Sequence, residues 1–107
     1  MKASQTSADC ATKLAVLADP TRLAVVEVLL AGSRNVTEIN RRVPVAQNLL
    51  SHHLRVLREA EIVTTSRDGK GIRYALAEGI ELGSAHNAIN LGCCSLKFTQ
   101  IQTRKKP

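Results

Sequence analysis

Three cysteines are the most reactive side chains of this 107-residue chain, and two of them are neighbours. Cys93 and Cys94 follow a glycine, and Cys10 lies near the other end of the sequence. Adjacent thiolates can converge on one soft ion, and two sulfurs with a third donor suit trivalent arsenic or antimony better than the tetrahedral preference of zinc. Cysteine pairs also occur as small buried apolar residues. We expect a ligand site at Cys93 and Cys94, because the pair lies beyond the last predicted helix.

A second group of polar side chains lies in residues 46–60. At about 100° per residue, these side chains fall in one arc of roughly 140° of a helix, opposite the apolar ones. The arc contains Gln47, Asn48, Ser51, His52, Arg55, Arg58 and Glu59. Amide, hydroxyl, imidazole and guanidinium groups pair with base edges and phosphates in a major groove. The pattern predicts a DNA-reading helix, with candidate contacts at Gln47, Asn48, Ser51, His52 and Arg55.

The pattern of residues 46–60 also has a second interpretation. An ordinary amphipathic surface helix shows the same apolar stripe and charged back, so both interpretations stay open on this segment alone. His53 projects into the middle of the apolar arc. We therefore expect His53 to be a core histidine with a local partner.

The charge of the whole chain favours a polyanionic partner. Fifteen Lys and Arg against nine Asp and Glu give a net charge of +6, which is typical of proteins that bind nucleic acid. Aromatic residues make up 2% of the chain, so stacking on single-stranded bases is not expected and duplex DNA is favoured. The sequence shows neither a glycine-rich phosphate loop nor a base beside the thiols. We expect no enzyme and no organic cofactor.

Periodicity and capping signals predict four helices before any hairpin. Asp19 before a proline is an N-cap and first-turn pair, and Asn35 with Glu38 forms a capping box. Pro44 ends the third helix shortly before the polar segment, so the third and fourth helices form a helix-turn-helix. The helices are expected at about residues 7–18, 20–30, 36–43 and 46–60.

Residues 62–76 change to a β-branched pattern with a turn signal at 68–69, which predicts a β-hairpin. A hairpin directly after a DNA-reading helix is a wing, from which Arg67, Lys70 and Arg73 could reach phosphates or an adjacent minor groove. A lone basic hairpin also occurs as a soluble sheet edge. The order of the elements favours the wing.

A last helix is expected over about residues 80–91, where Leu82, His86 and Ile89 share a stripe. The predicted fold class is thus mainly α with a β-hairpin, a winged helix-turn-helix.

The length predicts one domain, residues 1–107, with a modest core unless a partner chain completes it. We therefore expect a homodimer. The termini, residues 1–6 and about 100–107, are expected to be flexible.

The sequence carries no recognisable secretory signal peptide, and no apolar run approaches the roughly 18 residues of a membrane span. We therefore expect a cytoplasmic protein. Three cysteines are not expected to form a disulfide framework in that reducing compartment. Neighbouring cysteines close only a strained ring, so a redox sensor built on Cys93 or Cys94 would need Cys10 as partner.

Three stretches together carry a family resemblance: residues 17–23, 51–60 and 68–76. Over about residues 10–92 the chain resembles the ArsR/SmtB family of winged-helix repressors. The resemblance implies a homodimer paired through the first and last helices and bound to a palindromic operator. It also implies groove contacts at Gln47, Asn48, Ser51 and His52.

The chain departs from the family pattern at its metal sites. Asn35 and Thr37 stand where the third-helix metal box has cysteines. The Asp and His ligands of the family's last-helix site correspond to Glu78, Ile80, Leu91 and Cys94. A zinc or nickel sensor of these designs is therefore not implied. Glu61 stands where the family usually has a glycine that closes the DNA-reading helix.

The vicinal pair resembles the inducer site of arsenic repressors in this family, some of which have a third cysteine downstream. No cysteine follows Cys94 in this sequence, so either Cys10 supplies a third sulfur or two cysteines bind an organoarsenical with its own carbon ligand. The resemblance implies a metalloid-responsive repressor released by arsenite, methylarsenite or antimonite at Cys93 and Cys94. A thiol redox or persulfide sensor and a cadmium or lead sensor stay open as alternatives.

Overall fold

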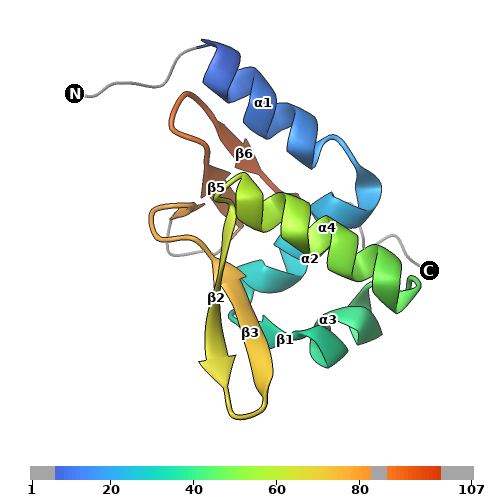
Figure 1. Ribbon diagram of the computed structural model, residues 1–107. Coiled ribbons are helices and arrows are strands. Elements are labelled where there is room, and N and C mark those ends of the chain that lie inside the picture. The colour runs from blue at the N-terminus through green and yellow to red at the C-terminus, as the bar shows by residue number, and fades with distance from the viewer. Residues whose placement is uncertain (1–6, 83–86, 100–107) are drawn as a thin grey trace.

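The computed structural model describes residues 7–82 and 87–99 (Figure 1). The helices are α1 Ser7–Leu17, α2 Pro20–Leu30, α3 Val36–Arg42 and α4 Gln47–Glu59. The strands are β1 Arg34–Asn35, β2 Val63–Asp68, β3 Gly71–Leu76, β4 Glu81–Leu82, β5 Ala88–Asn90 and β6 Ser95–Lys97. Four helices followed by a hairpin confirm the predicted winged helix-turn-helix. In the described part of the chain, no helix has the length and apolar character needed to cross a membrane.

The start signals of α2 and α3 act as predicted. The Asp19 carboxylate accepts a hydrogen bond from the backbone N–H of Arg22 at 3.0 Å. This bond lowers the pKa of Asp19, because it stabilises the charged carboxylate. At α3, the Asn35 side chain accepts from the Glu38 N–H at 2.8 Å, and Glu38 accepts from the Asn35 N–H at 2.9 Å. The predicted capping box is confirmed.

Helices α2 and α4 supply the centre of the hydrophobic core. Apolar side chains of α4 are fully buried at the four-residue and three-residue spacing of one helix face. The fully buried residues of the two helices are Val25, Val26, Leu50, Leu54 and Leu57. Ile39 from α3 and Ile62 before β2 complete this centre. The core therefore fixes which face of α4 points to solvent.

The carboxyl end of α4 is closed without a glycine. Glu61 adopts a φ of 63°, the left-handed conformation that the family usually gives to glycine. The Glu61 N–H donates to the Arg58 carbonyl at 2.9 Å, and the Ile62 N–H donates to the Leu57 carbonyl at 3.0 Å. These two bonds form a Schellman motif, with Ile62 and Leu57 both fully buried. Glu61 thus makes the expected cap.

The wing is formed by β2 and β3, which pair antiparallel with Asp68 opposite Gly71. Gly69 and Lys70 form the two-residue turn, and Gly69 adopts a φ of 61° that favours glycine. Strand β1 pairs with the other edge of β3. The wing projects from one end of the molecule, whereas α1 and β6 lie at the other (Figure 1).

The prediction of a last helix over residues 80–91 is wrong. The described residues of this segment form β4 and β5, which build a second sheet with β6 in the order β4-β5-β6. Residues Ile89 and Leu91 are buried with Asn90 half-buried between them, a period of two rather than of a helix. Residues 83–86, which include a part of the predicted stripe, lie outside the described residues. The expected pairing of two subunits through a helix at residues 80–91 is therefore not supported by this structure.

Candidate functional site

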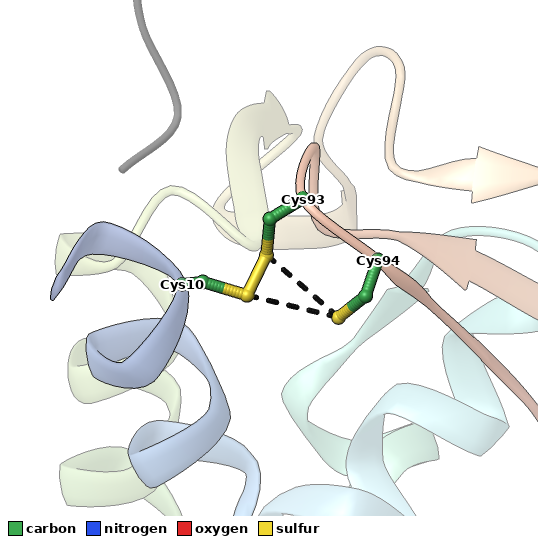
Figure 2. A group of neighbouring side chains, drawn as sticks. All are labelled: Cys10, Cys93 and Cys94. Atoms are coloured by element: carbon green, nitrogen blue, oxygen red, sulfur yellow. Dashed lines mark hydrogen bonds between the residues drawn. A yellow bond between two sulfur atoms is a disulfide. The ribbon is translucent and has the colours of Figure 1, made fainter. Parts of the chain in front are cut away.

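The three cysteines meet on one side of the molecule (Figure 2). Cys10 lies in α1, and Cys93 and Cys94 lie in the turn between β5 and β6. The Leu91 N–H donates to the Cys94 carbonyl at 2.8 Å and closes this turn. Gly92 adopts a φ of 94°, which L side chains rarely adopt. A turn that favours glycine at this point thus directs the cysteine pair toward α1.

Cys10 and Cys93 form a disulfide, with their Cα atoms 6.0 Å apart. Cys94 is a free, exposed cysteine. Its Sγ lies 3.8 Å from the Cys10 Sγ and 3.7 Å from the Cys93 Sγ. All three sulfurs lie within 4.8 Å of one another. The expectation of reduced thiols differs from this structure, because the fold brings together two cysteines that are 83 residues apart in sequence.

This cysteine cluster (Cys10, Cys93 and Cys94) offers two kinds of chemistry. When all three residues are reduced, three soft sulfur donors face a common centre, which suits thiophilic ions. When Cys10 and Cys93 are joined, Cys94 remains as one thiol beside the disulfide (Figure 2). The cluster is accessible, since Cys93 and Cys94 are exposed and Cys10 is half-buried.

The predicted DNA contacts of α4 share one exposed face. All are exposed: Gln47, Asn48, Ser51, His52 and Arg55. Leu49, which the periodicity groups with the apolar residues, is also 45% exposed. It lies about 100° around the helix from the fully buried Leu50, and so at the edge of the apolar arc. The face therefore includes one large apolar side chain besides its amides and cations.

His53 anchors the opposite face of α4. Its side chain is buried at 7% exposure, and its Nδ1 lies 2.9 Å from the Arg22 Nη1. Since arginine can only donate, Nδ1 accepts this bond and the imidazole proton resides on Nε2. The prediction of a core histidine with a local partner is confirmed. Arg22, which the sequence arguments did not single out, ties α2 to α4.

Asn40 was also missed, although it holds the turn between α3 and α4. Its Nδ2 donates to the carbonyl of Val43 at 3.0 Å and to that of Val45 at 2.9 Å. Both acceptors belong to the segment around Pro44 that links the two helices. The sequence did offer a signal for this role, because an asparagine four residues before a proline can hydrogen-bond to the backbone of the following turn. Asn40 thereby sets how α4 leaves the turn.

The wing cations differ in their surroundings. Arg67 and Lys70 are exposed. Arg73 is half-buried: its Nε donates to Ser33 Oγ at 2.9 Å and its Nη2 to the Ser33 carbonyl at 3.2 Å. Its Nη1 lies 3.0 Å from Asp68 Oδ2 and 3.9 Å from Glu38 Oε1. The guanidinium of Arg73 is thus engaged by the wing and by the start of α3.

Comparison with known proteins identifies the segment from α2 to the start of β2. Residues 19–65 match the model of the family described as "bacterial regulatory protein, arsR family". The chain is 38% identical over 73 residues to the HTH-type transcriptional regulator NmtR of Mycobacterium tuberculosis, covering 68% of this chain and 61% of NmtR. It is 36% identical over 87 residues to a probable mercury resistance operon repressor of Streptomyces lividans, covering 74% of this chain and 70% of that protein.

Solved structures show the same fold. The transcriptional repressor BigR from Xylella fastidiosa matches with a TM-score of 0.64 and 39% identity, covering 67% of this chain and 74% of that chain. Reduced HlyU from Vibrio cholerae matches with a TM-score of 0.64 and 30% identity, covering 67% of this chain and 76% of that chain. The family segment contains α2, α3 and α4 and ends in β2. All three cysteines lie outside it.

Proposed function

Because this chain belongs to the ArsR family of bacterial regulatory proteins, we propose that it is a transcriptional repressor that binds operator DNA as a homodimer. Thiophilic ligands release it by occupying Cys10, Cys93 and Cys94. The observation that carries this proposal is the approach of three sulfurs to within 4.8 Å of one another. As a DNA-binding regulator rather than an enzyme, the protein acts in the cytoplasm.

The exposed face of α4 supplies the DNA contacts. Gln47, Asn48, Ser51 and His52 present hydrogen-bonding groups to base edges, and Arg55 with the wing residues Arg67 and Lys70 neutralises phosphates. The exposed Leu49 suits an apolar contact with a thymine methyl group. Arg73 serves the same surface mainly by fixing the wing against Ser33. The net charge of +6 supports this interface.

The cysteine cluster sets the ligand class. Three thiolates around one centre suit arsenite and antimonite, since soft sulfur ligands favour thiophilic ions. Methylarsenite needs two sulfurs, because its methyl group fills the third position. A ligand bound to all three sulfurs would join α1 to the β5–β6 turn, as the disulfide does. Cadmium and lead share the preference for sulfur and are alternative ligands.

The homodimer rests on the packing of α1. Of its residues, Leu17 is the buried one, and Leu14 is 39% exposed. A second copy of α1 covering this face would complete a small core. The two α4 helices would then lie at a fixed spacing across the two-fold axis, as two half-sites of DNA require.

Helix α1 links the cysteine cluster to release of the repressor from its operator. Ligand binding that joins α1 to the β5–β6 turn shifts the population toward a dimer with a different spacing of its two α4 helices. A coupling free energy of about 1–3 kcal/mol lowers operator affinity by roughly 5- to 150-fold. That range is sufficient for derepression.

A redox response is the second candidate, and the Cys10–Cys93 disulfide favours it. Two thiols reacting with one peroxide form the disulfide and release two molecules of water. A polysulfide is an alternative oxidant: it accepts two electrons from the two thiols, one sulfur leaves as hydrogen sulfide with their two protons, and a polysulfide shorter by one sulfur remains. In either case the disulfide would join the same two elements that a metalloid joins, so oxidation would mimic ligand binding.

An operator-release assay by fluorescence anisotropy tests the proposal. The reduced protein is bound to its promoter fragment and challenged in parallel with arsenite, methylarsenite, antimonite, cadmium, lead, zinc, peroxide and polysulfide. We expect release by the trivalent metalloids but not by zinc, and no release in a Cys93→Ser/Cys94→Ser double variant that still binds DNA. Release of the double variant by arsenite would refute the assignment of the site.

Cys10→Ser tests whether release requires a link between α1 and the β5–β6 turn. If release requires a link between α1 and the β5–β6 turn, this variant loses the response to all three metalloids, although Cys93 and Cys94 can still bind methylarsenite. It also loses the response to peroxide, because no disulfide partner remains for Cys93. A variant that responds to all three metalloids as the wild type does would show that Cys93 and Cys94 suffice.

A further inference from the structure

Lys13 joins α1 to the carboxyl end of α4. Its Nζ donates a part-buried hydrogen bond to the Ala60 carbonyl at 2.8 Å. Cys10 lies three residues earlier on the same helix, and side chains at that spacing are neighbours on a helix surface. One short helical segment thus carries both a member of the cysteine cluster and a contact to the DNA-reading helix.

The acceptor of this bond, the Ala60 carbonyl, lies at the carboxyl end of α4. Ala60 is the C-cap of α4, and the last carbonyls of a helix have no partner within the helix. An ammonium group at this end also interacts favourably with the negative pole of the helix dipole. Lys13 therefore supplies from α1 a donor to the Ala60 carbonyl, in addition to the Schellman motif that α4 forms with Glu61 and Ile62.

The space around this contact is open. A cavity of about 400 Å³ separates α1 from the end of α4 and is lined by Asp9, Thr12, Lys13, Glu59, Ala60 and Glu61. Its polar lining contrasts with the fully buried Leu54 and Leu57 on the inner face of α4. Because the residues that line this pocket are polar or small, a displacement of α1 at this point would not leave a void in the core.

We infer that Lys13 is a positioning residue that transmits the state of the cysteine cluster to α4. This inference rests on the proposed function. Joining Cys10 to the β5–β6 turn moves the first turns of α1, and the Lys13–Ala60 bond carries that movement to the end of the DNA-reading helix. Lys13 contacts neither the ligand nor the DNA in this scheme.

The test compares operator affinity before and after loading in Lys13→Met, which keeps the aliphatic chain but removes the donor. Sodium arsenite is the probe, and loading is followed separately by the loss of free thiols. For wild type we expect a fall of about 5- to 150-fold on loading. Lys13→Met should bind arsenite with the same stoichiometry and bind the operator like wild type when unloaded, yet lose less than about threefold on loading.

Two controls make the result specific. Lys97→Met removes an equal charge from the exposed face of β6 and should leave the response intact. Lys13→Arg retains a donor and should restore most of it. If wild type is not released by arsenite, the proposed function and the inference both fail. If wild type is released and Lys13→Met is released to the same extent, the inference alone is overturned.

Discussion

The proposed DNA-binding region (residues 19–76) and the region that holds the cysteines are stabilised differently. In residues 19–76, helices α2 and α4 bury side chains such as Val25, Leu50 and Leu54 completely. In α1 and the turn at residues 92–94, Leu17 is the buried side chain and the turn is exposed. A disulfide between Cys10 and Cys93 joins these two elements. Apolar burial stabilises the first region, whereas the elements of the second are also joined by a disulfide.

This difference gives the face of α4 a constant geometry and leaves the position of α1 adjustable. Burial of apolar surface does not depend on redox state or on a metalloid, so the α4 face keeps its shape. A contact made by thiols exists or is lost according to the chemical state of the sulfurs. A regulator benefits from this division, because a signal can move α1 without disturbing the core beneath α4.

The largest expected effect contrasts Leu54 with Leu14. Leu54→Ala removes a fully buried side chain and should lower the free energy of unfolding by about 2–5 kcal/mol. Leu14→Ala should cost less than about 0.5 kcal/mol in the monomer, as most exposed positions do. Urea unfolding of the reduced proteins measures both. Equal costs would erase the contrast, whereas a Leu14 cost that grows with protein concentration would support the proposed dimer face.

Reduction of the disulfide should have the next largest effect. Breaking the Cys10–Cys93 link, which spans 83 residues of sequence, should lower the free energy of unfolding by about 2–4 kcal/mol. Urea unfolding with and without a dithiol reductant measures the difference. Cys94→Ser should retain the difference, and Cys10→Ser should abolish it. Native-state hydrogen exchange shows which region the disulfide stabilises. If reduction removed protection from α4 amides before those of α1, the conclusion that the disulfide mainly stabilises α1 would be wrong.

Within the DNA-facing region, the wing cations should differ in how they affect binding. Lys70→Ala should reduce the slope of log affinity against log salt by about 0.9, since one phosphate contact is lost. Arg73→Gln should leave that slope unchanged while lowering stability by about 1 kcal/mol, because its ion pairs with the part-exposed Asp68 and Glu38 are lost and its bonds to Ser33 are weakened. Salt titrations of operator binding, with urea unfolding, measure both. A reduced slope in Arg73→Gln would assign Arg73 to the DNA backbone.

The smallest effect concerns Asp19, where the two regions meet. Asp19→Ala removes the N-cap of α2 and should cost about 1 kcal/mol at pH 7. The pKa of Asp19 is lowered from its usual 3.8 by the hydrogen bond from the Arg22 N–H. Its stabilising effect is therefore fully present above about pH 4 and lost as the pH falls through the lowered folded-state pKa.

Asp19→Asn is the matched control, since an asparagine caps a helix without titrating in this range. Urea unfolding at pH 7, 5 and 3 should show the advantage of wild type over Asp19→Ala shrinking at pH 3. The advantage of Asp19→Asn over Asp19→Ala should not shrink. A constant wild-type advantage down to pH 3 would contradict the role of the charged carboxylate.

Local signals predicted the secondary structure of residues 19–76 well. A capping box, an aspartate before a proline and a glycine turn each act within a few residues. Asn35, Asp19 and Gly69 therefore determine where a helix or a turn begins without contacts from distant parts of the chain. The prediction of a last helix was wrong for the opposite reason. The spacing of Leu82 and Ile89 suits a helix, but pairing of β5 with β4 and β6 decided the conformation.

The candidate site divides in the same way. Exposure of Gln47, Asn48 and Ser51 followed from helical periodicity, whereas the engagement of Arg73 with Ser33 depends on a loop 40 residues away. Leu49 was grouped with the apolar face, but it lies about 100° around the helix from the fully buried Leu50, and so at the edge of that face.

The sequence by itself determined the helix order, the caps, the wing and the polar face of α4, because these depend on short-range periodicity and hydrogen bonds within a few residues. The tertiary structure alone decided that Cys10 reaches Cys93 and Cys94 and that Lys13 reaches Ala60. Cys10 and Cys94 are 84 positions apart in the sequence, and Lys13 and Ala60 are 47 positions apart. Only packing of the whole chain brings residues so far apart in sequence into contact.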